Sequence, residues 1–189
     1  MRPGFADPVF GSQAVFRALM DAMARPGRLQ VAGGLEDIPP GLDQAAAAAL
    51  LTLADAETLL WTDADGEARS WLAFHTGARF TANAAEADFL LSTGTPPPLT
   101  AIRAGSDESP QDGATLIIQV AALRAEAGWV LSGPGIETRY TLLADGLPSD
   151  FAAQCRDNVV RFPCGVDLIL TAGETLAALP RTTTIEEAA

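Results

Sequence analysis

Apolar residues near the N-terminus recur at the three- and four-residue spacing of an α-helix. Between Ser12 and Ala24 they form one stripe, made of Val15, Phe16, Leu19, Met20 and Met23. Ser12 can cap the first amide groups, and Arg25-Pro26-Gly27 should end the helix, because the residue before proline avoids helical angles. The pattern therefore predicts an amphipathic helix over 12–24.

Short apolar runs alternate with further helical segments along the rest of the chain. Helices are predicted at Leu42–Asp55, Glu67–Thr76 and Pro148–Val160. Strands are predicted at Gly27–Val31, Thr58–Thr62, Ala87–Ser92, Thr115–Leu123, Trp129–Ser132, Arg139–Leu143, Gly165–Thr171 and Thr175–Leu179. The polar Thr93–Gly113 stretch is expected to be a long loop.

The alternation of helix and strand in the first half favours an α/β sheet covered by helices. The glycine-rich turns between the three strands from Thr115 to Leu143 favour antiparallel pairing there. No repeat or linker divides the 189 residues. We therefore expect one α/β domain over 1–189, with a mixed sheet flanked by helices.

Composition and charge limit the classes of molecule that the chain is expected to bind. The chain is 48% hydrophobic but has no continuous apolar run long enough to cross a membrane. Its N-terminus has neither a basic leader nor an apolar run, so a cytoplasmic protein is expected. The net charge of −12 repels nucleic acids and anionic membranes, whereas a local group of arginines could still bind a small phosphorylated molecule.

All 12 basic residues are arginines, because the sequence contains no lysine. A pyridoxal-phosphate enzyme needs a lysine for its Schiff base, and P-loop NTPases and protein kinases each need a lysine at the phosphates. The chain alone is therefore excluded from these three classes, and no cofactor is expected.

His75, in the sequence FHT, is the one histidine. It could bond backbone carbonyls at a helix end, or it could act as a base, since a catalytic triad needs a single histidine. No GxSxG nucleophile motif accompanies it. Cys155 and Cys164 have no CxxC or HxxxH spacing, so no metal site is predicted and both thiols are expected to be inert.

Two glycine-containing segments could be taken for phosphate loops. Gly133–Thr138 begins like a dinucleotide fingerprint but has Thr138 in place of the third glycine and precedes a strand, so a hairpin turn is predicted. Ser92–Thr95 (STGT) follows a strand and could present hydroxyls and amides to a phosphate, or could be a plain loop.

Arginines beside proline turns are candidates for binding. Arg25 and Arg28 flank the first helix–strand turn, and Arg161 and Arg181 border the C-terminal hairpin. Their planar guanidinium groups suit a phosphate or a partner's carboxylates, and ordinary surface ion pairs are the simpler interpretation.

Seven segments in register carry a resemblance to a known family. They are FRALMDAMARPG (16–27), LLTLAD (50–55), FHTGA (74–78), STGT (92–95), GATLIIQV (113–120), LSGPGI (131–136) and FPCGVDLILTAGETLAALPRTTT (162–184). Together they resemble the H subunits of the carbon–phosphorus lyase system, the PhnH family of phosphonate-metabolism proteins.

This resemblance implies a reduced pyridoxal-phosphate-dependent transferase fold that lacks the cofactor. It also implies a homodimer, assembled with G, I and J subunits and assisted by an ATP-binding L-type partner. That system converts ATP and methylphosphonate into ribose 1-methylphosphonate 5-triphosphate and releases adenine. The family supplies no catalytic residue for this subunit.

Two functions are carried forward. The first is a structural or ligand-binding subunit, not catalytic alone, with Arg25, His75, Arg161, Asp167 and Arg181 as candidate ligand-binding or interface residues. The second is a cofactor-free hydrolase or nucleosidase-like enzyme using His75, Asp167 or Glu174 with an arginine phosphate pocket.

Overall fold

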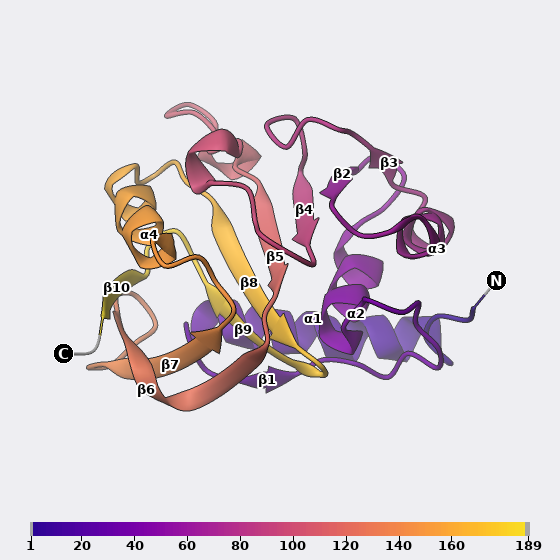
Figure 1. The fold of residues 1–189 in the computed structure, drawn as a ribbon, viewed down its shortest axis with the longest axis horizontal. Helices are drawn as coiled ribbons and strands as arrows, with labels where there is room; N and C mark the ends of the chain where they lie inside the picture. The colour runs from indigo at the N-terminus through magenta and orange to yellow at the C-terminus, as the bar shows by residue number, and fades with distance from the viewer. Residues whose placement is uncertain (1, 188–189) are drawn as a thin grey trace.

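The computed structural model describes residues 2–187, so the first residue and the last two residues of the predicted domain lie outside it. Its centre is a seven-stranded sheet with helices on one side and a helix and a three-stranded sheet on the other (Figure 1). The predicted mixed α/β class, with a mixed sheet flanked by helices, is confirmed.

The large sheet has the strand order β1-β9-β8-β5-β4-β2-β3. Its strands are β1 (Gln30–Val31), β2 (Leu59–Thr62), β3 (Arg79–Phe80), β4 (Phe89–Ser92), β5 (Thr115–Gln119), β8 (Asp167–Ala172) and β9 (Thr175–Leu179). The five strands from β8 to β3 are parallel, and β9 and β1 add an antiparallel edge. The sheet is therefore mixed.

Successive side chains along the strands of the large sheet point to opposite faces, so the hydrophobic core has two parts, one on each face. Leu91, Ile117 and Ile169 face one side with α1 (Pro8–Ala24), α2 (Gln44–Leu53) and α3 (Gly66–Thr76). The residues next to them in sequence face the other side, where α4 (Phe151–Val160) packs with the small sheet. Five alanines of α2 are fully buried, which lets this helix approach the sheet closely.

The small sheet has the order β10-β6-β7 and is antiparallel throughout. It consists of β6 (Ala122–Ser132), β7 (Tyr140–Asp145) and β10 (Thr184–Glu187), and β10 was not predicted from the sequence. Gly133–Thr138 joins β6 to β7, so the predicted turn is confirmed and no helix begins there.

The first helix begins four residues earlier than predicted. Asp7, not Ser12, is its N-cap, and the Asp7 carboxylate accepts hydrogen bonds from the Val9 and Phe10 amides. The Ser12 hydroxyl instead donates to the Pro8 carbonyl, 2.5 Å away. The proposed Ser12 cap is wrong because proline is tolerated in the first turn, where its missing N–H costs nothing.

The predicted strand Thr115–Leu123 is two strands in different sheets. β5 ends at Gln119 and lies parallel between β4 and β8, whereas β6 starts at Ala122 and turns into the small sheet. The antiparallel prediction is therefore correct for the pairing of Trp129–Ser132, which is part of β6, with β7, and it is wrong for β5. The turn predicted between Leu123 and Trp129 is also wrong, because both residues lie in β6. A run that is apolar on both faces suits a central parallel strand, and periodicity alone does not reveal the break.

The loop predicted at Thr93–Gly113 contains two short 3₁₀ helices, η1 (Leu99–Ala101) and η2 (Pro110–Asp112). The predicted end of α3 is confirmed, because Gly77 has a φ of 71° and closes the helix in the left-handed conformation. Within the described part of the chain, no helix is both long and apolar enough to cross a membrane.

Candidate functional site

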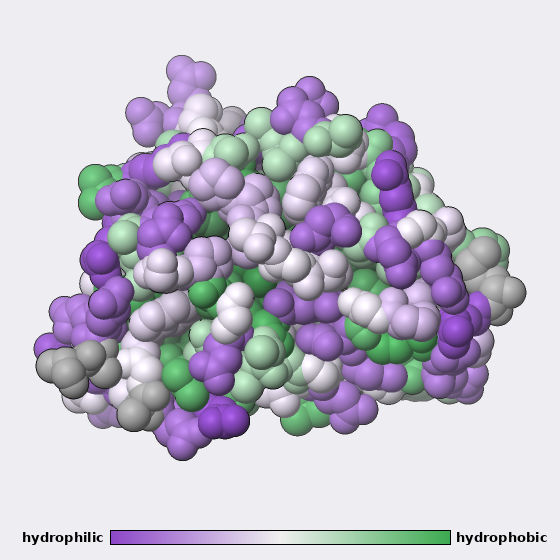
Figure 2. Space-filling model, viewed as in Figure 1, coloured by the Kyte–Doolittle hydropathy of each residue, from purple (hydrophilic) through white to green (hydrophobic). Residues whose placement is uncertain are grey.

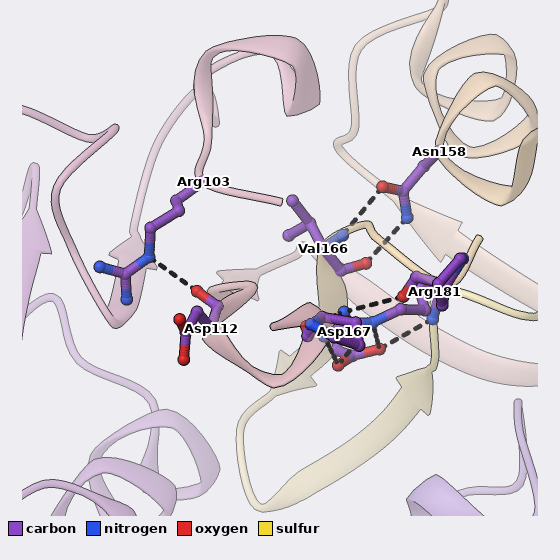
Figure 3. Close-up of polar contacts among 8 residues, drawn as sticks. Arg103, Asp112, Asn158, Val166, Asp167 and Arg181 are labelled. Atoms are coloured by element: carbon purple, nitrogen blue, oxygen red, sulfur yellow. Dashed lines mark hydrogen bonds and ion pairs between the residues drawn. The ribbon is translucent and has the colours of Figure 1, made fainter. Parts of the chain in front are cut away.

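Arg181 and Asp167 form a nearly buried ion pair at the start of β8 (Figure 3). The Arg181 Nη2 lies 2.6 Å from Asp167 Oδ2, and its Nε lies 3.2 Å from both carboxylate oxygens. The Arg181 Nη1 donates to the carbonyls of Pro110 (2.7 Å) and Pro163 (3.4 Å). Because four guanidinium N–H groups have partners, this arginine joins strand and loops and offers little to a phosphate.

Two further side chains near this ion pair also bond neighbouring loops, and neither was singled out from the sequence. The side-chain amide of buried Asn158 pairs with both backbone groups of Val166, at 2.8 and 2.9 Å (Figure 3). Arg103 forms an ion pair with Asp88 before β4 and donates to the Asp112 carbonyl at 2.7 Å. These contacts fix the loops at the amino ends of β4 and β8.

The opposite edge, where the parallel strands end, is where open α/β sheets usually bind ligands. The switch point lies between β2 and β4, because the chain leaves β2 for β3 on one side and returns to β4 on the other. The carboxylate of Asp63, directly after β2, occupies this position. It accepts from Ser92 Oγ (3.0 Å), Thr93 N (2.6 Å), Thr93 Oγ1 (3.1 Å) and Gly94 N (3.2 Å).

Asp63 therefore stands where a phosphate would have to bind in the STGT loop. The two amides and two hydroxyls that could hold an anion are directed at a carboxylate of the same chain. This geometry favours the interpretation of Ser92–Thr95 as a structural loop.

The same edge is closed further along by the segment that leads into α2. Gln119, at the end of β5, accepts from the Asp43 amide (2.7 Å) and donates to the Gly41 carbonyl (2.9 Å). Burial raises the pKa of Asp43, although hydrogen bonds from the Gly173 amide and the Thr171 hydroxyl oppose the shift. The carboxyl ends of the central strands are thus covered by the protein's own loops.

His75 lies in the last turn of α3 and holds the N-terminal segment. Its Nε2 is 3.0 Å from the Arg2 carbonyl oxygen, which also accepts from Trp71 Nε1 at 3.1 Å. The His75 ring is tilted against Trp71 at 4.5 Å between centroids and meets the edge of Phe74 at 5.1 Å. A helix-end histidine that bonds a backbone carbonyl is what the simpler sequence interpretation described.

A cavity of about 260 Å³ adjoins His75, lined by Gly4, Phe5, Pro8, Ser12 and Leu51. The Ser12 hydroxyl in this cavity is committed to the Pro8 carbonyl. Among residues 2–187 no carboxylate is hydrogen-bonded to His75, so a serine–histidine–acid arrangement is not formed there.

The other candidate residues lie apart from one another. Arg25 caps the end of α1 and pairs with Asp21 on the surface, at 3.1 Å. Arg161 is exposed at the end of α4, between Val160 and Phe162, whose relative exposures are 84% and 62%. Glu174 lies in the β8–β9 turn, where its carbonyl accepts from the Ala32 amide. Of the predicted site residues, the structure brings together only Asp167 and Arg181.

The two cysteines are free thiols in different environments. Cys155 is buried in α4, and burial raises its pKa to about 12, while Cys164 is partly exposed and lies 3.7 Å from an Asp107 carboxylate oxygen. In the described range, no three histidine, cysteine, aspartate or glutamate residues gather as a metal site would require.

Comparison with known proteins matches nearly the whole chain. The model of the family described as "Bacterial phosphonate metabolism protein (PhnH)" matches residues 3–186. The "Alpha-D-ribose 1-methylphosphonate 5-triphosphate synthase subunit PhnH" of Rhizobium meliloti is 38% identical over 187 residues, covering 96% of this chain and 94% of that protein. The "Putative C-P lyase subunit protein HtxG" of Stutzerimonas stutzeri is 33% identical over 173 residues, covering 92% and 85%.

Proposed function

Because the chain belongs to the PhnH family of bacterial phosphonate-metabolism proteins, we propose that it is a subunit of the carbon–phosphorus lyase complex in alkylphosphonate catabolism. The observation that carries the proposal is the 38% identity, over 96% of this chain and 94% of its relative, to a subunit of ribose 1-methylphosphonate 5-triphosphate synthase. The assembly would join ATP to methylphosphonate and release adenine, with the chemistry shared among its chains.

The proposed role is structural or ligand-binding, and the chain is not catalytic alone. Support comes from the geometry of its candidate groups. The Asp63 carboxylate occupies the switch point at the carboxyl edge of the sheet, and four N–H groups of the Arg181 guanidinium are bonded to Asp167 and to carbonyls. Neither site leaves a group of convergent polar atoms free to act on a substrate.

The proposed assembly contains two copies of this chain with G, I and J subunits and an ATP-binding L-type partner, in the cytoplasm. Exposed apolar side chains such as Phe10 (70%), Met20 (57%) and Phe162 (62%) support association, because burying them in an interface is favourable. Arg25 and Arg161 would act at interfaces, and a phosphorylated molecule remains a candidate ligand of the assembly.

We further propose that residues 1–189 form one domain with a reduced transferase-like fold lacking pyridoxal phosphate. The contacts of β6 with β8 and β9 support a single unit, because they join the small sheet to the large one. The absence of lysine from the sequence supports the loss of the cofactor.

The alternative, a hydrolase or nucleosidase-like enzyme, would use His75 as its base. No hydrogen bond within the described chain favours it, since His75 contacts a backbone carbonyl instead of an acid or a nucleophile.

Gene deletion and complementation test the proposal. A host that lacks this chain should fail to grow with methylphosphonate as its sole phosphorus source, grow normally with phosphate, and recover when the chain is restored. The purified chain should turn over neither ATP nor methylphosphonate. Unimpaired growth of the deletion strain on methylphosphonate would refute the proposal.

A further inference from the structure

A groove of about 520 Å³ runs between the C-terminal half of α1 and the large sheet. Its lining is almost entirely apolar: Phe16, Leu19, Met20, Met23, Ala24, Leu53, Phe89, Thr115 and Ile169. Small-molecule sites place several polar groups among apolar walls, and only Thr115 contributes a polar side chain here. The lining therefore suits a protein segment better than a small polar ligand.

The groove has a buried floor and exposed walls. Ile169 of β8 and Leu19 of α1 are only 3% and 4% exposed, whereas Phe16 and Met20 are 47% and 57% exposed. Phe16 and Met20 are four residues apart, so they stand one above the other on α1. By comparison, the face of the molecule drawn in Figure 2 is mainly hydrophilic, and its hydrophobic patches are separate from one another.

A helix is the element that fits such a groove. The ridge formed by Phe16 and Met20 can interdigitate with a ridge of a second helix, as packed helices do. An amphipathic helix presents three to four apolar side chains in two turns, and a 520 Å³ groove has room for several such side chains. The methionines Met20 and Met23 can adapt to their shapes.

Charge indicates that the helix comes from a different chain. Two copies of this chain meeting at this groove would bring like-charged carboxylates together, which disfavours self-association at this surface. Asp55 and Glu57 follow the lining residue Leu53, and Glu86 precedes Phe89. These three exposed carboxylates form no ion pair with residues 2–187.

The side of the groove formed by α1 carries a different balance of positive and negative charge. Asp21 and Arg25 neutralise each other there, and exposed Arg17 adds one positive charge. On the strand side, exposed Arg79 donates to the Glu57 carbonyl and adds a second positive charge. Three carboxylates against these two arginines leave one negative charge in excess around the groove. A partner helix with lysine or arginine beside its apolar face complements these carboxylates.

We propose that this groove docks an amphipathic, basic-flanked helix from an unlike subunit of the assembly. The inference rests on the proposed function for the existence of such subunits, and it adds the surface and the chemistry of the contact. Burial of Phe16 and Met20 would supply the apolar centre of the interface, and the carboxylates would set its orientation.

Site-specific photo-crosslinking of the assembled complex tests this. The chain carries benzoylphenylalanine in place of Met20 and is co-expressed with the other proteins of the phosphonate system. The result expected is a crosslink to a helix of an unlike chain, with lysine or arginine next to apolar residues. A crosslink between two copies of this chain, or none in an intact complex, would overturn the proposal.

Charged variants give an independent measurement. Met20→Glu should reduce the fraction of the chain recovered in the complex by about tenfold. Val31→Glu is the matched control, because Val31 is 73% exposed and does not line the groove, and it should assemble like the unchanged chain. Circular dichroism and urea unfolding establish that both variants fold.

The outcomes separate the two claims. If the unchanged chain enters no complex, the proposed function is refuted, and so is the docking inference that rests on it. If the unchanged chain assembles and Met20→Glu assembles equally well, only the docking inference is overturned.

Discussion

Arg181 and Asp167, fourteen residues apart in sequence, meet through a two-pronged ion pair in which both side chains are less than a fifth exposed, at 13% and 18%. The Arg181 backbone amide also donates to Asp167 Oδ1 at 2.8 Å. Because the same guanidinium bonds Pro110 and Pro163, the pair ties together the start of β8, the segment after β9 and two loops.

Removing either partner should therefore destabilise the fold. Arg181→Ala would leave the Asp167 carboxylate without its counter-charge in a poorly hydrated position, and we expect a loss of about 2 to 4 kcal/mol in the free energy of unfolding. Arg181→Lys should retain only part of the lost free energy of unfolding, since an ammonium group cannot make the parallel hydrogen bonds of a planar guanidinium group. Urea unfolding measures both.

Arg25→Ala is the matched control for that series. Arg25 also pairs with an aspartate, but its side chain and that of Asp21 are 49% and 54% exposed. We expect a change within about 0.5 kcal/mol. Equal losses for Arg25→Ala and Arg181→Ala would show that the buried pair does not support the fold.

Asp63 should stabilise the loop after β4. Asp63→Ala removes the acceptor of four hydrogen bonds, so the amides of Thr93 and Gly94 should exchange hydrogen faster and the chain should lose about 1 to 3 kcal/mol of stability. Hydrogen exchange with mass spectrometry measures the loop directly. Glu137→Ala, which removes an exposed carboxylate, serves as control, and the same exchange pattern in both variants would contradict this role.

His75 should matter for stability more than for phosphonate use. His75→Ala removes one of two donors to the Arg2 carbonyl, and we expect a loss of about 1 kcal/mol while growth on methylphosphonate persists. His75→Gln, which keeps a donor, should lose less. Abolished growth with a folded, assembled His75→Ala chain would instead support the enzymatic alternative.

Cys155 should resist alkylation in the folded chain. Burial raises its pKa to about 12, so the thiol stays protonated and poorly nucleophilic at pH 8. Iodoacetamide at pH 8 should modify partly exposed Cys164 first and Cys155 only after unfolding, as peptide mass spectrometry would show. Equal labelling of both in the native state would contradict the buried position.

The raised pKa of Cys155 also makes the free energy of unfolding depend on pH. The folded chain holds the Cys155 proton more tightly than the unfolded chain, whose thiol has a pKa near 9.0. This stabilisation is complete below pH 9 and is lost as the pH rises toward about 12. Cys155→Ala should flatten the decline of unfolding free energy across that range.

The elements that the sequence predicted well carry strong local signals. The C-terminal hairpin was placed correctly, with the Thr175–Leu179 strand at its observed bounds, because Ala172-Gly173-Glu174 marks a turn between apolar runs. Gly77 likewise marked the end of α3. Local chemistry decides these features.

The features that were missed depend on contacts distant in sequence. Whether β5 pairs in parallel with β4 and β8 is decided by the whole sheet, and its own residues do not encode it. Asp63 lies 29 residues from Ser92, so a carboxylate in the STGT loop could not be foreseen from STGT itself. Arg181 and Asp167 were both singled out, but nothing in their spacing joined them to each other.

The measurement that tests the central claim most directly is the subunit composition of the complex that contains this chain. The tagged chain is purified from its native host, grown with methylphosphonate as sole phosphorus source, and its partners are quantified by mass spectrometry. We predict three unlike subunits in amounts nearly equal to this chain. Recovery of this chain by itself, with no stoichiometric partner, would contradict its assignment as a subunit of the carbon–phosphorus lyase complex.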